Sequence, residues 1–325
     1  MLHITPVFLG IFDSTIQKLM NGYRDIFYEL AYANLDTMLE DMNEKAASIG
    51  TELATSPDVW QDGTIWELIV KIAENVALPV AGTVFTFVVL WELISLLVRP
   101  NNLADVDFVS VIIKWLLKTM VAAWFISNSL VICNCFFGIG ADMVQKTQTT
   151  LGTISAENTQ GSVLLKFLTD NYGDQEEDAE SGDVSGLISL AISTWLIDIF
   201  MRIMGVLVTV ILYSRMISIY LHCAVAPLPL SVITNSHLSG MGQGYLKNLF
   251  ALAMQAVLLM ICVAVYGVLV AHLFDPTTIT LDPENGVTAL KLLTKACWST
   301  VGISILLVYT MFKCEGITKQ IFAVQ

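Results

Sequence analysis

The sequence predicts an all-α, polytopic helical membrane protein, and three observations lead to this fold class. Of the 325 residues, 55% are hydrophobic and only 14% are charged, whereas soluble domains carry about 25% charged residues. The apolar residues also gather in several runs of the length that an α-helix needs to cross a bilayer, about 20 residues. Two of these runs contain no charged residue at all. Lipid is therefore the expected solvent for most of the chain.

The first part of the chain, residues 1–60, is expected to form an amphipathic, extracytoplasmic helical region. Ser14 and Gln17 match a capping box, so we expect the helix to begin there and to run to about Gly50. Apolar residues recur at helical spacing on one face, and the polar face is mainly acidic. An acidic face suits packing on protein, or the external side, better than contact with anionic cytoplasmic lipid.

Five apolar runs are predicted to be full membrane spans. The two uncharged runs are residues 119–141 and 248–274, and the other three are residues 76–98, 187–214 and 290–312, with one or two charges each. The organisation that follows has two membrane helices in 61–139, a loop in 140–186, a membrane core in 187–313 and a short tail in 314–325.

The loop 140–186 is the longest polar stretch and contains the acidic run 174–180. Its carboxylate spacing does not match a calcium-binding loop, so metal binding is the weaker interpretation and a solvated or partner-facing loop the stronger one. The six cysteines lie in or beside apolar runs and form no metal-site spacing. We expect no metal and no cofactor.

Charge near the predicted spans gives the orientation. Cytoplasmic loops are enriched in Lys and Arg, so Lys114 and Lys118 place the first short loop inside. The acidic loop 140–186 and the N-terminus are then extracytoplasmic, and Lys313 and Lys319 place the C-terminus in the cytoplasm. Because Lys291 and Lys295 would lie at the external end of the last span, a six-span arrangement with an external C-terminus stays open.

The segment 216–233 is apolar but contains Pro227 and Pro229. With the chain inside at both Arg215 and Lys247, this segment is not a simple span. The two prolines remove backbone donors and push Ala226 and Leu228 towards extended geometry. A re-entrant or broken helix that faces protein or an aqueous cavity is therefore expected here.

Three groups of residues are candidates for a functional role. Asp198 and Arg202 lie four residues apart on one helix face and form a structural pair, a pore-facing polar site or an ion relay. Pro227 and Pro229 define the broken helix. After it come Gly240, Gly242 and Gly244, which we expect in a flexible turn because their spacing matches no phosphate-binding loop.

The order of these elements resembles the TrbL-type (VirB-system) polytopic inner-membrane subunits of conjugative type IV secretion systems. The resemblance covers about residues 76–313 and rests on the external N-terminal region, the large external loop, and the stretch AVAPLPL at 224–230. This stretch is followed by SGMGQGY at 239–245 and an apolar helix at 246–273.

The resemblance implies a homo-oligomeric subunit of a translocation channel in the cell (inner) membrane, in contact with membrane lipid. Its partners would be other type IV secretion subunits, including cytoplasmic ATPases, and transient single-stranded DNA or protein substrates. The sequence has no GxxxxGK[ST], HExxH or GxSxG motif, so we expect no enzymatic activity. The net charge of −13 argues against a nucleic-acid groove of clustered Lys and Arg, so contact with DNA would be indirect.

Two other functions stay open. Asp198, Arg202 and the broken helix are also compatible with a secondary transporter or ion channel, although no inverted repeat is visible between the halves. The third alternative is a purely structural assembly scaffold.

Overall fold

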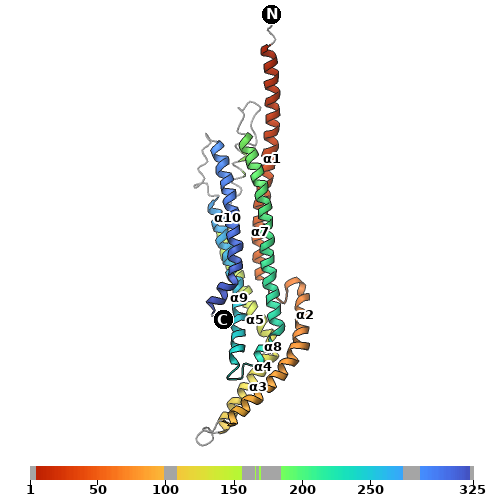
Figure 1. Ribbon diagram of the computed structural model, residues 1–325, viewed down its shortest axis with the longest axis vertical. Coiled ribbons are helices and arrows are strands. Elements are labelled where there is room, and N and C mark those ends of the chain that lie inside the picture. Colours follow the sequence, from red (N-terminus) through yellow and green to blue (C-terminus); the bar gives the residue numbers. More distant parts are fainter. Residues whose placement is uncertain are drawn as a thin grey trace. The chain divides into compact units, whose positions relative to one another are not determined.

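The computed structural model describes residues 5–98, 108–155, 165, 168–169, 184–273 and 286–322 of the chain. Within these ranges every long element is a helix, which confirms the all-α prediction (Figure 1). The helices are α1 (Thr5–Ala54), η1 (Trp60–Gly63), α2 (Thr64–Ile72), η2 (Ala73–Ala77), α3 (Leu78–Val98), α4 (Phe108–Ser127), α5 (Ser129–Ser155), α7 (Val184–Val225), α8 (Pro227–Ser231), α9 (Ser239–Leu273) and α10 (Gly286–Ile321).

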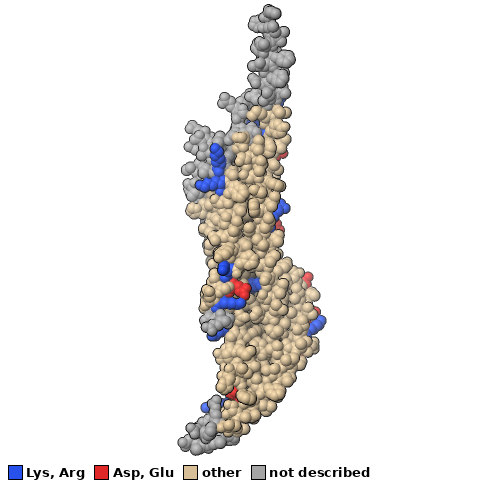
Figure 2. Space-filling view, in the orientation of Figure 1, with Lys and Arg blue, Asp and Glu red and all other residues tan. Residues whose placement is uncertain are grey.

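Five helical stretches of the described chain are long and apolar enough to cross a membrane, as predicted. They are Trp60–Val98, Val109–Ser127, Ser185–Ser231, Ser239–Val270 and Leu293–Ile321. Uncharged residues cover most of the face shown in Figure 2, and the charged side chains form only small groups on it. A surface of this kind suits a hydrocarbon environment, because burying charge in lipid is costly.

The chain divides into two compact units, and each has its own core. The first unit comprises Met1–Ser48, Thr149–Thr209 and Cys262–Thr310. In its core, Leu35 and Met38 of α1 pack with Leu187 and Leu190 of α7 and with Cys297 of α10, all of them at most 2% exposed. The buried positions of α1 follow helical spacing, so the amphipathic face predicted for this region is the face that packs on protein.

The second unit comprises Ile49–Gln148, Val210–Ile261 and Met311–Gln325. Its main core joins Trp60, Cys133 and Phe137 to Tyr220 of α7 and Leu249 of α9. Helices α5 and α9 approach closely, because a Cβ atom added at Gly140 would lie 2.7 Å from the carbonyl oxygen of Ala253. Small residues allow such backbone contacts between membrane helices.

Helix α1 begins at Thr5, so the capping box predicted at Ser14 does not start it. The predicted end at about Gly50 lies close to the observed end at Ala54.

The apolar run 119–141 is not one helix, because α4 and α5 meet at Asn128. The backbone N–H of Asn128 and its side-chain Nδ2 both donate to the carbonyl of Trp124, at 3.0 and 2.9 Å. Such local side-chain bonding perturbs a helix. The span in this region is therefore Val109–Ser127, and α5 stays helical through 140–155, part of the predicted loop. The acidic run 174–180 lies outside the described residues.

The broken helix is present, but its break lies later than position 216. Helix α7 continues to Val225, α8 follows after Ala226, and α9 begins at Ser239. Ala226 has φ −49° and ψ −41°, so the prediction of an extended residue before Pro227 is wrong. A 3.3 Å bond from its N–H to the carbonyl of Cys223 keeps Ala226 in a tight helical turn, and a proline is tolerated at the first position of the next helix.

Candidate functional site

The break between α7 and α9 is held inside the second unit by α8. This short helix contacts α3, α4 and η2. Leu230 of α8 is 1% exposed and packs with Ala81 of α3 and Ile126 of α4. Pro227 and Ser231 are buried as well. The proline segment therefore faces protein.

Several backbone carbonyls around the break receive hydrogen bonds from within the segment. The hydroxyl of Ser231 donates to the carbonyl of Leu228 at 2.7 Å, and the N–H of Ile233 donates to the carbonyl of Leu230 at 3.2 Å. Backbone at membrane depth that lacks regular helical bonds is stable only when protein or water satisfies its polar groups. Here the protein itself provides hydrogen-bond donors to some of these carbonyls.

The end of α7, the short helix α8 and the start of α9 form a corner, and Gly242 is the glycine that this corner requires. A Cβ atom added there would lie 2.9 Å from the carbonyl oxygen of Pro229 and 3.1 Å from side-chain atoms of Ile233, whereas one added at Gly240 or Gly244 would meet no atom within 4 Å. All three glycines lie in the first turns of α9, so the predicted flexible turn is wrong. The corner brings Pro229 and Gly242 together.

The connection between α8 and α9 is tied to neighbouring helices by polar groups. The side-chain oxygen of Asn235 accepts the N–H groups of His237 and Leu238 at 2.8 and 3.1 Å, which caps the start of α9. Glu92 of α3 accepts the N–H of Ser236 at 3.3 Å and pairs with Lys118 of α4 at 3.6 Å. Glu92 is the single charge in its apolar run, and its carboxylate thus links α3 to α4 and to the connection between α8 and α9.

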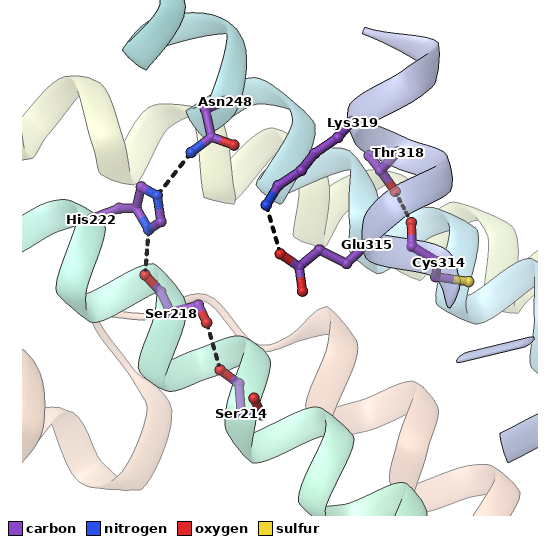
Figure 3. A network of polar contacts seen from close by, with 8 residues as sticks. All are labelled: Ser214, Ser218, His222, Asn248, Cys314, Glu315, Thr318 and Lys319. Atoms are coloured by element: carbon purple, nitrogen blue, oxygen red, sulfur yellow. Dashed lines mark hydrogen bonds and ion pairs between the residues drawn. The ribbon is translucent and has the colours of Figure 1, made fainter. Parts of the chain in front are cut away.

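A second polar group links α7 with α9 next to the corner (Figure 3). His222 Nδ1 lies 2.7 Å from the carbonyl of Ser218, and its Nε2 lies 2.9 Å from the amide nitrogen of Asn248. Because a carbonyl can only accept, Nδ1 donates its hydrogen bond to Ser218, and the amide of Asn248 donates to Nε2. The Tyr245 hydroxyl donates to the carbonyl of His222 at 3.0 Å. Among the described residues, no group of His, Cys, Asp or Glu could hold a metal ion.

The connection between α1 and α2 docks on α7 through aromatic side chains. Trp60 lies edge-on to Tyr213, with ring centroids 5.3 Å apart, and 6.0 Å from the Tyr220 ring. The Tyr220 hydroxyl donates to the carbonyl of Pro57 at 2.8 Å. Next to it, a hydrogen bond from the hydroxyl of Ser56 lowers the pKa of the Asp58 carboxyl below its ordinary value of 3.8, against the opposing effect of partial burial.

Asp198 and Arg202 belong to the first unit and form the expected pair on α7. Arg202 Nε lies 3.0 Å from Asp198 Oδ2, and its Nη2 lies 4.0 Å from Asp41 of α1. One turn further along α1, Lys45 donates to the hydroxyl of Thr209 at 2.8 Å. Sequence analysis missed these α1 partners, although an acid and a base four residues apart on one amphipathic helix were the available signal.

These features define a multi-pass α-helical membrane protein with a proline-broken helix packed inside its second unit. The chain belongs to the TrbL/VirB6 family: the family model described as TrbL/VirB6 plasmid conjugal transfer like protein matches residues 42–227. The protein is thus a component of a conjugal transfer system. The match ends at Pro227, the first residue of α8. Comparison with the curated proteins and with the solved structures gives no match.

Proposed function

We propose that this protein is a channel or scaffold subunit of a conjugative type IV secretion machine and helps to move single-stranded DNA and protein across the cell membrane. Family membership supports the assignment to a conjugative secretion machine. The packed α7–α8–α9 corner is the observation that supports a role in the path that the substrate takes across the membrane. Irregular backbone at membrane depth is costly unless it is buried in protein or lines a water-filled space. A machine that passes a polar polymer needs a water-filled space of this kind within the membrane.

The protein is proposed to act as a homo-oligomer. In the spans Trp60–Val98 and Val109–Ser127, 11% of the most apolar stretch is buried, against 56% in the span Ser239–Val270. Large apolar side chains are exposed on α3 and α4, among them Phe87, Trp91 and Met120 at 74%, 66% and 71%. A bundle of about five spans is too small to enclose a polymer, so we place the contacts with further copies on α3 and α4.

The energy for transfer is proposed to come from partners, which would be the cytoplasmic ATPases of the machine. The sequence has no phosphate-binding loop and no hydrolase motif. We therefore propose a role without catalysis. A secondary transporter or ion channel remains the alternative function, and a purely structural scaffold is the third.

Restoring a continuous helix at the corner tests the proposed function. In the double variant Pro227→Ala and Pro229→Ala two backbone donors return, and each interior proline costs a helix about 3 kcal/mol relative to alanine. We expect α7 to extend through α8, and conjugation frequency to fall at least about tenfold while the protein still inserts and the machine still assembles.

Pro79→Ala is the matched control, because it also replaces a proline of a membrane helix by alanine, and Pro79 is exposed on α3. It should transfer at the normal rate. Normal transfer by the double variant would contradict a role of the corner in the path, and loss of the assembled machine would favour the scaffold alternative.

Orientation is tested at Ser236, which lies exposed in the α8–α9 connection. Ser231 is 0% exposed and would resist labelling from either side. With the native cysteines removed, Ser236→Cys should react with a membrane-impermeant thiol reagent only after the cytoplasmic side is opened. Labelling in intact cells would instead place this connection outside and reverse the proposed cytoplasmic C-terminus and extracytoplasmic N-terminus.

A further inference from the structure

Arg215 of α7 is a buried cation that forms no ion pair with any residue the structure describes. The residue is 7% exposed, and its Nε has no hydrogen-bond partner. Its Nη1 lies 3.8 Å from the sulfur of Met216, a weak acceptor. Among the residues that the structure describes, no carboxylate lies within 4.0 Å of it. Removing one partner from a buried ion pair is strongly unfavourable, so an anion or water has to reach this guanidinium.

A cavity of about 120 Å³ adjoins Arg215 and carries further polar groups. Ser214 and Ser218 line it from α7, Gln255 from α9 and Glu315 from α10. Gln255 is 6% exposed and turns a polar side chain to the lining of the cavity. Figure 3 shows Glu315 extending from α10 towards the side of α7 that carries Ser214 and Ser218. A guanidinium with an unpartnered Nε and a buried amide thus meet at one cavity inside the second unit.

We propose that this cavity binds a phosphodiester group, and that the group belongs to a membrane phospholipid. The planar guanidinium binds phosphate through parallel N–H groups, and the Gln255 amide and the Ser214 hydroxyl add donors. The Ser218 hydroxyl already donates to the carbonyl of Ser214 at 2.9 Å. Glu315 lines the cavity from α10, and one of its carboxylate oxygens pairs with Lys319 at 2.7 Å. The carboxylate keeps part of its negative charge at this wall of the cavity. That wall disfavours a second negative charge, so a monoanionic phosphodiester fits better than dianionic inorganic phosphate.

The surroundings of the cavity identify lipid as the source of the phosphodiester. Its lining includes Val210 and Phe312, which are 54% and 57% exposed, so the cavity opens beside apolar surface. Both residues lie in candidate membrane spans, Ser185–Ser231 and Leu293–Ile321. A nucleic acid is disfavoured, because the chain has a net charge of −13 and binding a polyanion needs clustered Lys and Arg.

The test uses the full-length protein in nanodiscs made of phosphatidylglycerol and a galactolipid that has no phosphate, followed by extraction into mild detergent and native mass spectrometry. Wild type should retain phosphatidylglycerol, and Arg215→Gln should retain about tenfold less, as expected for loss of a charged hydrogen-bonding group. Lys247→Gln, which removes an exposed cation of α9, should behave like wild type. Arg215→Lys should fall between the two.

Two further arms separate the possible ligands. Thermal stability in inorganic phosphate should stay unchanged for wild type, and should rise for Glu315→Gln, because the negative wall is gone. Stabilisation of wild type by inorganic phosphate without retained phospholipid would overturn the lipid source, and displacement of phospholipid by an oligothymidylate would assign the site to nucleic acid instead.

Equal retention of phosphatidylglycerol by wild type and Arg215→Gln would overturn the proposal, as would retention of the galactolipid alone. If Arg215→Gln does not fold, Gln255→Met keeps the side-chain volume, removes the amide donors and leaves the charge of Arg215 in place. This variant should retain several-fold less phosphatidylglycerol, and unchanged retention would contradict the site.

Discussion

Replacing Gly242 by alanine is expected to destabilise the protein by about 1 to 3 kcal/mol, the usual cost of forcing extra atoms into a packed interior. The new Cβ would lie 2.9 Å from the carbonyl oxygen of Pro229, a backbone atom that cannot rotate away. The first turn of α9 would have to move off α8, and the corner would open. Unfolding in mild detergent, followed by tryptophan fluorescence, measures the effect, and conjugation frequency should fall with it.

The neighbouring glycines provide matched controls for this substitution. Gly240→Ala and Gly244→Ala introduce the same methyl group into the same helix, where no atom lies within 4 Å. Alanine is the better helix former, so each should be neutral or stabilise by up to about 1 kcal/mol. Equal destabilisation by all three variants would show that the contact between Gly242 and Pro229 is not what limits this position.

Trp60→Ala is expected to cost about 3 to 5 kcal/mol of stability, the range for truncating a large buried aromatic side chain. Trp60 is 8% exposed, packs on Tyr213 and Tyr220, and anchors the connection between α1 and α2 on α7. Without the indole the connection loses its main apolar contact. Chemical unfolding of the purified protein measures the loss.

Trp91→Ala is the control, because Trp91 is 66% exposed on α3. Its unfolding stability should stay within about 0.5 kcal/mol of wild type, as for exposed positions in general. If α3 and α4 carry the contacts between copies, this variant should instead shift the particle size in mild detergent towards smaller assemblies. A wild type that is already a monomer and still passes substrate would contradict the proposed homo-oligomer.

The spans and the broken helix could be predicted from the sequence, because both depend on local chemistry. Hydrophobic length decides whether a helix can cross a bilayer, and prolines remove donors wherever they stand. The helix boundaries were harder to predict from the sequence. The junction at Asn128 carries a side-chain hydrogen bond within an uncharged run, and α1 is already helical at Thr5, before the apparent cap at Ser14.

The candidate site could be predicted only in part, since it depends on which helix faces meet. The pair Asp198 and Arg202 follows from helical spacing, but its link to Asp41 requires α1 to pack along α7. Spacing did not distinguish Gly242 from Gly240 and Gly244, because only the packing of α9 on α8 separates them. Arg215 resembled an orientation signal in the sequence, and its burial beside Gln255 appears only in the packed structure.

Cross-linking of the substrate during transfer tests the central claim most directly. A photoreactive residue at Gly240 or Gly244 fits the open space beside the corner, and one at Phe87, which is 74% exposed on α3, serves as the control. If the protein lies on the path, the transferring substrate should be recovered on the corner positions but not on Phe87, and only when the ATPases of the machine are active. A machine that transfers at the normal rate without any cross-link at the corner, or with equal cross-links when the ATPases are inactive, would contradict the account.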